Sequence, residues 1–538
     1  MAVPRALAFV WALVHLVYMR SVESASSGSW KLLVKNAGVS AMHMTLTSAN
    51  TVIMYDRTDY GPSQLNLPDG RCREDLNDLA LTTDCYAHAI EFDIATNTIR
   101  ALEVLTDSWC SSGAFLADGT LVSTGGWNDG SRSIRFFTPC SDGSCDLSEV
   151  PDGLAKARWY ASNQILPDNS IIVVGGRRAF SYEFAPKTTG VINLPFLYET
   201  NEPNTENNLY PFLHLSSDGN LFIFANSRSI LLDYKSNKIV RTYPELMGGS
   251  RNYPSSGSSV MLPLYAENNF QRVEVMICGG APHGAFQKAA NESFVAALDT
   301  CARMVITDPD PSWSIEAMPS SRIMGDMLLL PTSEVMIING AKQGTAGWQS
   351  ARIPSLSPYL YRPTAPVGSR FEVVAASTIP RLYHSSTVLL PDGRILVGGS
   401  NPNPGYTFVG VPFPTELSIE AYSPYYLDTA LDTQRPYITA LSNQIGYGGT
   451  FEVDFTLSVD PTDVQFKLYA PAFSTHTTAM NQRQLILQPT SISGTPEEGF
   501  VAMVQTPPNA IAAPAGFYLL FVVNHGAPSP GAWVQVVS

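Results

Sequence analysis

Residues 166–176 read LPDNSIIVVGG, and this stretch decides the fold that the chain is expected to adopt. Its Asp-Asn pair favours a tight turn, and the run from Ile171 to Val174 suits a strand that is buried on both faces. The closing pair, Gly175 and Gly176, lets another backbone approach closely because glycine has no side chain. The stretch therefore predicts a β-hairpin whose second strand ends at a close backbone contact.

The same phrase returns along the chain after about fifty residues, which indicates an internal repeat. Residues 116–126 read LADGTLVSTGG, and residues 391–399 read PDGRILVGG. Weaker copies bring the total to seven; they are residues 49–55, 218–224, 273–280 and 335–340. Units of this length and pattern are typical of kelch-like β-propellers, whose blades pack around a central channel. We predict an all-β fold with a seven-bladed kelch-like β-propeller, and a set of separate small β-domains is the alternative.

A second β-domain is expected after the repeats, which end near Tyr425. Residues 427–436 have the composition of a linker. The later segments 450–457, 464–469, 484–487 and 516–523 have the pattern of strands, which predicts an immunoglobulin-like β-sandwich of about 100 residues. The predicted domains are thus the propeller in residues 26–430 and the sandwich in residues 431–538. The loop 474–478 would present His476 at a sandwich edge that faces the propeller.

The first 25 residues have the features of a secretory signal peptide. Arg5 precedes an apolar run over residues 6–18, and small residues at positions 24–26 offer a cleavage site. A single membrane anchor is the alternative, but the run is short against a hydrocarbon layer of about 30 Å, and Arg20 interrupts it. We predict a secreted protein of the extracellular space or cell wall that is not held in a membrane.

The formal net charge of -14 and the pI of about 5.0 restrict the partners. An acidic chain without a Lys/Arg cluster repels the phosphate groups of nucleic acids and of anionic lipids. We therefore expect no binding to nucleic acid or to a membrane surface, whereas small neutral ligands remain open. Hydrophobic residues make up 45% of the chain and charged residues 15%, which argues against extended disorder. A monomer is expected.

Seven cysteines are an odd number for a chain that is expected to be secreted. Local proximity favours three disulfides, each closing a short loop: Cys72 with Cys85, Cys140 with Cys145, and Cys278 with Cys301. This pairing leaves Cys110 over, and an inert buried thiol is one interpretation of it. Asn291 begins an Asn-Glu-Ser sequence, which is an acceptor site for N-glycosylation and agrees with export.

No familiar zinc, nicotinamide or serine-hydrolase motif occurs in the sequence. Three other patterns stand out shortly before copies of the repeated phrase: DSWCSSG at residues 107–113, ARWYAS at residues 157–162, and PRLYHSS at residues 380–386. Because the patterns occupy equivalent places in their units, a propeller would bring them together near one end of its channel.

These three patterns, followed in order by Thr475-His476-Thr477, resemble the galactose oxidase and glyoxal oxidase family of copper radical enzymes. The resemblance extends over nearly all of the mature chain. Further stretches are similar to the plant glyoxal oxidase-like branch: GRCR at residues 70–73, DCYAH at 84–88, NYPS at 252–255 and RIMGD at 322–326. Four motifs in the same order make the resemblance specific, whereas one of them alone would not.

The resemblance implies one copper ion held by Tyr160, Tyr383, His384 and His476, with one open position for substrate. Mixed nitrogen and oxygen ligands of this kind suit Cu(II). It also implies a thioether between Cys110 and the ring of Tyr160, which would account for the unpaired cysteine. Oxidation of an aldehyde hydrate or an alcohol removes two electrons, so a second one-electron store is needed beside Cu(II)/Cu(I), and the cross-linked tyrosine would supply it. Tyr383 would be the general base.

We therefore expect an oxidase that converts small aldehydes, of the glyoxal or methylglyoxal type, to carboxylic acids and reduces O2 to hydrogen peroxide. A primary alcohol or galactose oxidase that acts on sugars or cell-wall polysaccharide is the second hypothesis. A non-catalytic propeller that binds a wall polymer or a receptor is the third, and the intact set of cysteine, tyrosines and histidines argues against it.

Two details of the sequence bear on this expectation. Tyr383 and His384 are adjacent, and neighbours on a regular strand point to opposite faces, so we expect an irregular backbone there. Galactose oxidase places a tryptophan over its cross-linked ring just after a Gly-Gly pair, whereas this chain has Arg177 and Arg178 at that point. The other histidines are scattered singly and are expected to be structural; they are His43, His88, His214, His283 and His525.

Overall fold

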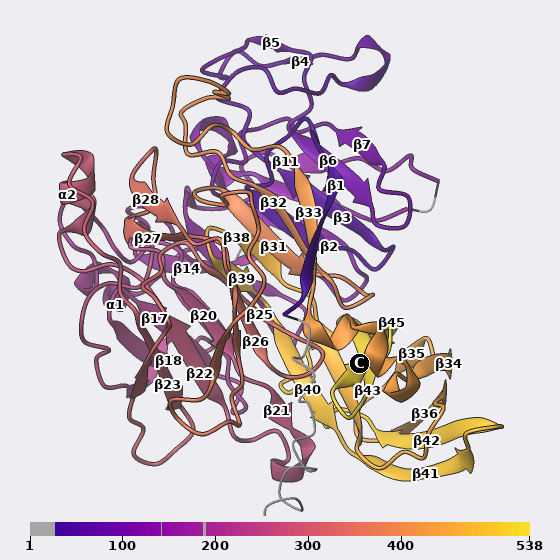
Figure 1. The fold of residues 1–538 in the computed structure, drawn as a ribbon. Helices are drawn as coiled ribbons and strands as arrows, with labels where there is room; N and C mark the ends of the chain where they lie inside the picture. Colours follow the sequence, from indigo (N-terminus) through magenta and orange to yellow (C-terminus); the bar gives the residue numbers. More distant parts are fainter. Residues whose placement is uncertain (1–26, 141, 187–189) are drawn as a thin grey trace, which may run out of the picture.

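A computed structural model describes residues 27–140, 142–186 and 190–538, and this part of the chain is built almost entirely of β-strands (Figure 1). The predicted signal peptide lies outside the described residues. Helix is confined to short 3-10 turns and to α1 (Pro195–Glu199) and α2 (Ala285–Ala290) within the described part. Neither α-helix has the length or apolar character needed to cross a bilayer. The all-β class predicted from the sequence is confirmed.

Each of the seven predicted copies of the repeated phrase forms a strand, and each is the second strand of an antiparallel sheet. These strands are β3 (Thr51–Tyr55), β9 (Leu121–Thr124), β13 (Ile171–Gly175), β17 (Leu221–Ala225), β22 (Glu274–Cys278), β26 (Val335–Ile338) and β32 (Ile395–Gly399). Their buried Ile, Val and Leu side chains explain the apolar run that marks each copy. The repeat seen in the sequence is therefore a repeat of sheets.

The first strands of the second to seventh sheets contact one another in chain order, and strand β38 (Phe473–Thr475) contacts the first strands of both the first and the second sheets. The seven first strands are β2 (His43–Leu46), β8 (Ser112–Phe115), β12 (Ala161–Ile165), β16 (Phe212–Leu215), β20 (Ser258–Met261), β25 (Asp326–Leu329) and β31 (Ser385–Leu389). The series continues from β31 back to β2, which it also contacts. The first strands of the seven sheets are thus gathered together.

The outer strands complete four-stranded units in the described part of the chain. They are β6 (Ala89–Asp93), β7 (Ile99–Leu102), β10 (Ile134–Phe137), β11 (Ser148–Val150), β14 (Ser181–Ala185), β15 (Ile192–Asn193), β18 (Arg228–Asp233), β19 (Lys238–Thr242), β23 (Thr300–Val305), β24 (Ser314–Ala317), β29 (Tyr359–Tyr361), β30 (Phe371–Val373) and β33 (Ile419–Ser423). The seventh sheet takes its outer strand from the start of the chain, because β1 (Ser29–Val34) pairs with β33. This pairing joins the two ends of the repeat region, residues 29–423.

Glycines that follow second strands connect neighbouring sheets. The N–H group of Gly340 donates to the carbonyl of Arg381 at 2.8 Å, and Gly280 donates to Arg322 at 3.1 Å. A Cβ atom at Gly340 would lie closer than 3.0 Å to the carbonyl of Ile323. Side chains are therefore excluded from these positions, which explains the paired glycines of the repeated phrase.

Buried arginines complete the same contact from the other side. The Nη1 groups of Arg158 and Arg381 each donate at 2.8 Å to the carbonyl of a glycine in their own sheet, Gly175 and Gly399. Arg158 also pairs with buried Glu183 at 2.9 Å, so its charge is compensated. We call this combination of a glycine that follows the second strand and a buried arginine the Gly–Arg joint.

The C-terminal region forms two further sheets, the second of which also includes a strand from the repeat region, β21 (Leu264–Tyr265). One contains β34 (Tyr437–Leu441), β36 (Thr450–Thr456), β42 (Gly499–Gln505) and β41 (Pro489–Thr495); the other contains β21, β40 (Arg483–Leu487), β37 (Val464–Ala470), β43 (Gly516–Asn524), β44 (Ala527–Pro528), β45 (Ala532–Val536) and β35 (Gln444–Ile445). The four predicted sandwich strands are all present. The expected linker forms two 3-10 turns, Tyr425–Leu427 and Thr429–Gln434.

One hairpin leaves the C-terminal region and enters the repeat region (Figure 1). Strands β38 (Phe473–Thr475) and β39 (Thr478–Met480) pair with each other, and β38 pairs with β2 of the first sheet. Phe473 and Met480 are buried in a hydrophobic cluster with side chains of the repeat region. The expectation that His476 sits at a sandwich edge is therefore wrong, because apolar side chains on both strands anchor the hairpin inside the repeat region.

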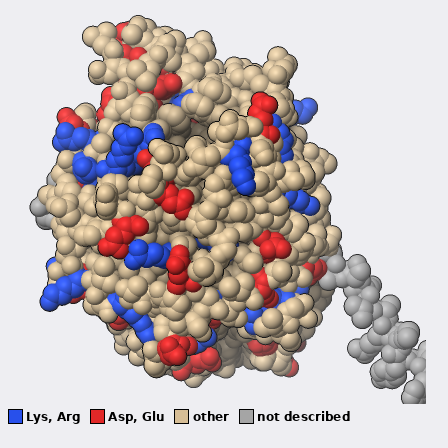
Figure 2. All heavy atoms as spheres, turned by 90° about the vertical axis from the view of Figure 1, so that its left-hand side faces the viewer, with Lys and Arg blue, Asp and Glu red and all other residues tan. Residues whose placement is uncertain are grey.

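The three predicted disulfides are present, and Cys110 is a free, buried cysteine. On the face drawn in Figure 2, positive and negative side chains are interspersed over a largely uncharged surface. This distribution agrees with the absence of a Lys/Arg cluster in the sequence. It offers no basic patch on that face to attract a polyanion.

The Gly–Arg joint predicts an unequal response of two glycines to the same substitution. Gly340→Ala should lower the free energy of unfolding by about 3 kcal/mol or more, because the new methyl group meets backbone carbonyls. Gly368→Ala should cost only about 1 kcal/mol, since Gly368 also has a positive φ but has open space around its Cβ position. Thermal unfolding of both variants measures the difference, and equal costs would contradict the role assigned to the joint.

The buried carboxyl of Asp326, the first residue of β25, should make the free energy of unfolding depend on pH. Burial raises the pKa of its carboxyl from 3.8 to about 7, and Asn339 Nδ2 donates to it at 2.9 Å. The folded state holds this proton more tightly than the unfolded chain, so stability is lost as pH rises from 3.8 to about 7. Asp326→Asn removes this loss. The difference in free energy of unfolding between the variant and wild type should therefore shift in favour of the variant by about 2 kcal/mol from about pH 5 to pH 7. Melting temperatures across that range test it, and a constant difference would contradict it.

Candidate metal centre

Residues with a left-handed backbone lie just before the first strands of several sheets. Cys110 (φ 55°), Tyr160 (φ 65°) and His384 (φ 64°) precede β8, β12 and β31. This conformation is unfavourable for side-chain-bearing residues, by about 1 kcal/mol each, so the surrounding contacts must enforce it. This left-handed conformation turns the three side chains toward one end of the repeat region. The irregular backbone predicted at Tyr383-His384 is confirmed.

The inserted hairpin brings the fifth predicted site residue to the same place. His476 (φ 46°) and Thr477 (φ 68°) form the turn between β38 and β39. Thr477 Oγ1 donates to the carbonyl of Gly257 at 2.7 Å, which fixes the tip of the hairpin. The imidazole of His476 therefore points into the group formed by the other predicted residues.

All five predicted site residues come together in one buried cluster. The hydroxyl oxygens of Tyr160 and Tyr383 are 3.4 Å apart, and the rings of His384 and His476 have centroids 4.9 Å apart. Cys110 Sγ lies 3.2 Å from His476 Nε2. Donor atoms of Cys110, His384 and His476 all lie within 4.8 Å of one another, and no other such group of His, Cys, Asp and Glu occurs in the described part of the chain.

Hydrogen bonds fix one nitrogen of each imidazole, and the second nitrogen of His476, Nε2, faces Cys110 Sγ. Thr475 Oγ1 donates to the carbonyl of Met42 at 2.9 Å, so its oxygen accepts from His476 Nδ1 at 2.7 Å. His384 bonds to the backbone of Asn401, and its buried Nε2 has no hydrogen-bond partner. Both rings are thus held in the orientation that a metal ligand needs, with the second nitrogen fixed by a neighbour.

Burial makes the cluster neutral in the absence of a cation. It raises the pKa of the Tyr160 and Tyr383 phenols well above 10 and lowers the pKa of the His384 and His476 imidazoles well below 6.5. Burial also raises the pKa of the Cys110 thiol. A bound cation would reverse the balance for the phenols, because it favours their ionised form. The donor set of two phenols and two imidazole nitrogens fits a copper ion.

Comparison with known proteins decides the family. The family description "Glyoxal oxidase N-terminus" matches residues 42–426, and "Galactose oxidase-like, Early set domain" matches residues 435–536. The chain belongs to the glyoxal oxidase family. This glyoxal oxidase family member resembles curated proteins over almost its whole length. It is 46% identical to "Aldehyde oxidase GLOX" of Vitis pseudoreticulata, with 95% of this chain and 97% of the relative covered.

Two further relatives of this glyoxal oxidase family member differ widely in their identity to it. It is 45% identical to "Aldehyde oxidase GLOX1" of Arabidopsis thaliana, with 95% of this chain and 85% of the relative covered. It is 24% identical to "Galactose oxidase" of Gibberella zeae, with 80% of this chain and 61% of the relative covered. The resemblance stated from the four sequence motifs is confirmed.

Two tyrosines that border the cluster, Tyr253 and Tyr210, were not among the site residues predicted from the sequence. Tyr253 stacks on the ring of Tyr160, with centroids 4.4 Å apart. Tyr210 meets Tyr160 edge-on, and its hydroxyl donates to the carbonyl of Ser111 at 2.9 Å. A signal for Tyr253 does exist in the sequence, since Arg251-Asn252-Tyr253 repeats the Arg-x-Tyr spacing of the predicted site tyrosines.

A group of tryptophans and arginines adjoins the cluster. Trp159 contacts the Tyr160 ring at 4.6 Å and Trp109 at 4.9 Å. Arg177 lies 5.3 Å from the centre of the Trp159 ring, not over Tyr160. The arginine that follows the Gly-Gly pair in this glyoxal oxidase family member therefore covers a tryptophan, while the face of Tyr160 is covered by other rings.

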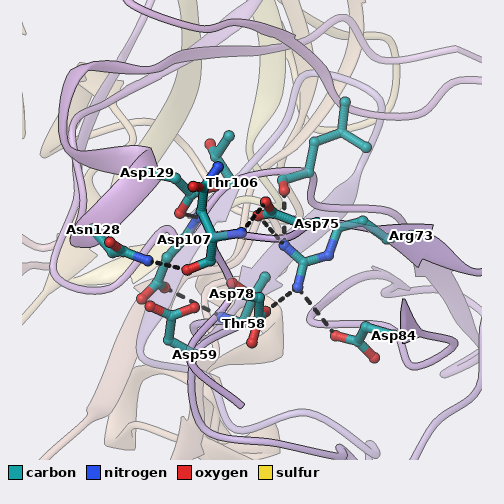
Figure 3. A network of polar contacts seen from close by, with 12 residues as sticks. Thr58, Asp59, Arg73, Asp75, Asp78, Asp84, Thr106, Asp107, Asn128 and Asp129 are labelled. Atoms are coloured by element: carbon teal, nitrogen blue, oxygen red, sulfur yellow. Dashed lines mark hydrogen bonds and ion pairs between the residues drawn. The ribbon is translucent and has the colours of Figure 1, made fainter. Parts of the chain in front are cut away.

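A polar network holds the segment that carries Cys110 (Figure 3). Asp107 Oδ1 accepts from the N–H groups of Thr58 at 3.2 Å and Trp109 at 3.0 Å, and the N–H group of Asp107 donates to Asp129 at 3.1 Å. Burial and the nearby Asp59 raise the pKa of Asp107 well above 3.8. The neutral carboxyl thus ties the loop after β3 to the segment before β8.

Arg73 lies alongside Asp107 in the same network and anchors the remainder of that loop (Figure 3). Its guanidinium pairs with a set of carboxylates: Asp75 at 3.4 Å, Asp84 at 3.4 Å, and Asp78. His88 Nε2 lies 2.7 Å from Asp84 and belongs to this network. This contact gives His88 a structural role, as expected for the scattered histidines.

The other scattered histidines do not belong to the cluster, and their contacts explain their positions. His43 stacks on Tyr55 at 4.2 Å, and burial lowers its pKa to about 3. Hydrogen bonds account for the rest: His214 contacts Ser259, His283 contacts Glu202, and His525 contacts Thr462. The expectation that these histidines are structural agrees with these contacts.

Asp107 provides a test of how the Cys110 segment is held. Asp107→Asn should be tolerated, because an amide oxygen can accept both hydrogen bonds and burial already favours the neutral carboxyl. Asp107→Ala leaves the N–H groups of Thr58 and Trp109 without an acceptor, at about 1–3 kcal/mol each. Amide hydrogen exchange of the two segments should be faster only in the alanine variant. Equal protection in both variants would show that other contacts hold the segment.

Proposed function

We propose that this protein is a copper radical oxidase that converts small aldehydes to carboxylic acids and reduces O2 to hydrogen peroxide. The observation that carries the proposal is the convergence of Cys110, both site tyrosines and both site histidines in one buried cluster. Two relatives at 45–46% identity are named aldehyde oxidases, which supports an aldehyde as the substrate class. The overall reaction balances as aldehyde hydrate plus O2 giving carboxylic acid plus hydrogen peroxide.

The proposal includes the architecture that positions the site. The seven sheets in residues 26–430 would close radially as a β-propeller, and residues 431–538 would form the sandwich. The contact between the first and last sheets and the pairing of β1 with β33 support closure. The three disulfides support secretion, because such bonds persist in oxidising compartments.

The copper ion would be held by the oxygens of Tyr160 and Tyr383 and by Nε2 of His384 and His476. When bound, it supplies a one-electron Cu(II)/Cu(I) couple and favours the ionised phenols. A thioether from Cys110 to the Tyr160 ring would make that ring the second one-electron store. The sulfur donates electron density into the ring and makes its one-electron oxidation easier.

The residues of the chain would divide the remaining work. Tyr383, as a phenolate, would accept the proton of the substrate hydroxyl, which requires hydrogen-bond contact with that group. An aldehyde would enter as its hydrate, whose two hydroxyl groups make it similar to an alcohol. Tyr160 would accept the hydrogen atom from the substrate carbon. Burial of the cluster keeps bulk water away from these steps.

Cys110→Ser separates the catalytic proposal from a binding-module function. Copper-loaded wild type should lose two hydrogens in intact mass after oxidation, show a radical absorption band, and release peroxide with glyoxal and methylglyoxal. Cys110→Ser should show none of the three, with its copper content retained because Cys110 is not one of the four proposed ligands. A Cys140→Ser, Cys145→Ser double variant is the matched control and should keep all three signals.

The outcomes of that comparison divide the hypotheses. Peroxide with galactose in place of aldehydes would replace the substrate class with primary alcohols of sugars. Absence of copper binding, or a wild-type mass with an intact Cys110 thiol, would overturn the catalytic proposal in favour of a binding propeller.

A further inference from the structure

We infer that Tyr253 is a positioning residue of the redox site: its ring covers Tyr160, and its hydroxyl joins Tyr160 to Tyr383. The inference rests on the proposed function, because the consequence of this arrangement is an effect on the oxidised state of Tyr160. It concerns a residue outside the cysteine, tyrosine and histidine set proposed above.

The ring of Tyr253 is the best stacking partner that Tyr160 has. The two rings are 4.4 Å apart with an interplanar angle of 25°, an offset-stacked arrangement. Trp159 is nearly as close, at 4.6 Å, but its plane is tilted by 40°. Tyr210 meets Tyr160 edge-on at 84° and 5.6 Å. Tyr253 therefore provides the most nearly parallel cover for the ring that would carry the radical.

The hydroxyl of Tyr253 forms a triangle with the two proposed ligand hydroxyls. It lies 3.1 Å from the Tyr160 hydroxyl and 3.0 Å from the Tyr383 hydroxyl, while those two are 3.4 Å apart. If Tyr160 and Tyr383 are ionised on a cation, they can only accept hydrogen bonds. Tyr253 then carries the proton of the triangle and donates a charge-assisted hydrogen bond, which is stronger than a neutral one.

Contacts on both sides of Tyr253 hold it in this position. Its N–H group donates to the carbonyl of Leu209 at 3.2 Å, and Asn252 Nδ2 donates to the carbonyl of Tyr210 at 2.9 Å. Arg251 is buried and donates to Gly279 at 2.7 Å, as Arg158 and Arg381 do in their sheets. Tyr253 is thus the third tyrosine that a Gly–Arg joint places at this end of the repeat region.

The exposed fractions of the three tyrosines differ. Tyr160 and Tyr383 are only 4% and 3% exposed, whereas Tyr253 is partly exposed. Tyr253 is therefore the more exposed member of the stacked pair. A ring stacked in this way limits the access of solvent and reductants to the face that it covers.

Loss of the Tyr253 ring and loss of its hydroxyl should have different effects on Tyr160. A hydrogen bond to the Tyr160 phenolate stabilises the reduced form more than the oxidised form, because the phenolate carries more charge on oxygen. Removing the hydroxyl should therefore make Tyr160 easier to oxidise. Removing the ring should in addition uncover Tyr160 and shorten the lifetime of its radical.

Two substitutions at Tyr253 and one at Tyr210 separate these effects. Tyr253→Phe keeps the ring and removes the hydroxyl, whereas Tyr253→Leu removes both. Tyr210→Phe is the matched control, because Tyr210 also borders Tyr160 but its hydroxyl bonds to a backbone carbonyl. Intact mass, copper content and melting temperature establish that each variant is folded and cross-linked.

The readouts are the equilibrium and the lifetime of the radical, measured without substrate. At a fixed ratio of ferricyanide to ferrocyanide, Tyr253→Phe should raise the ratio of radical to reduced form about tenfold, as expected for loss of a hydrogen bond to a charged acceptor. Tyr253→Leu should shorten the decay time of the radical band several-fold relative to Tyr253→Phe. Tyr210→Phe should match wild type in both measurements.

Failure of this inference can be told apart from failure of the proposed function. If wild type forms the thioether and the radical but both Tyr253 variants behave like Tyr210→Phe, Tyr253 is only a packing residue and the inference is overturned. If wild type binds no copper or retains the Cys110 thiol, the proposed function fails and the inference fails with it.

Discussion

The contact between a glycine at the end of the second strand of one sheet and the backbone of the next sheet is the constraint on which the other features depend. Gly340 binds the carbonyl of Arg381, and the Arg381 guanidinium binds the carbonyl of Gly399 in its own sheet. The tyrosine two residues further on is Tyr383. The same order, arginine followed by tyrosine after one residue, occurs at Tyr160. The joint that packs the sheets therefore also sets where the phenols point.

The second constraint is the hairpin that enters the repeat region from the C-terminal region. Its anchoring by Phe473 and Met480 depends on apolar burial, and its turn delivers His476. The site is therefore shared between parts of the chain that are more than 300 residues apart. All its donors are buried, and burial is the largest cause of the pKa shifts that favour neutral phenols and imidazoles. Such a site can fold with its donors uncharged and acquire charge when a cation binds.

Local patterns explain how much of this could be predicted from the sequence. Apolar runs identify the second strand of every sheet, and paired glycines mark the end of four of them, because strand burial and close approach leave marks within a few residues. The path of the hairpin could not be predicted, because it depends on pairing and packing with strands that are distant in the sequence. Tyr253 was missed for a related reason. Its Arg-x-Tyr spacing is visible, but the distance of its hydroxyl from those of Tyr160 and Tyr383 appears only when three sheets are assembled.

Peptide mapping of the copper-loaded, oxidised protein tests the central claim most directly. Trypsin cleaves after Arg100, Arg132, Arg158 and Arg177, so residues 101–132 carry Cys110 and residues 159–177 carry Tyr160. The proposed site predicts that these two peptides are recovered as one species, two hydrogens lighter than their sum, with fragment ions that locate the bond at Cys110 and Tyr160. Recovery of two separate peptides, with Cys110 open to alkylation, would contradict the account.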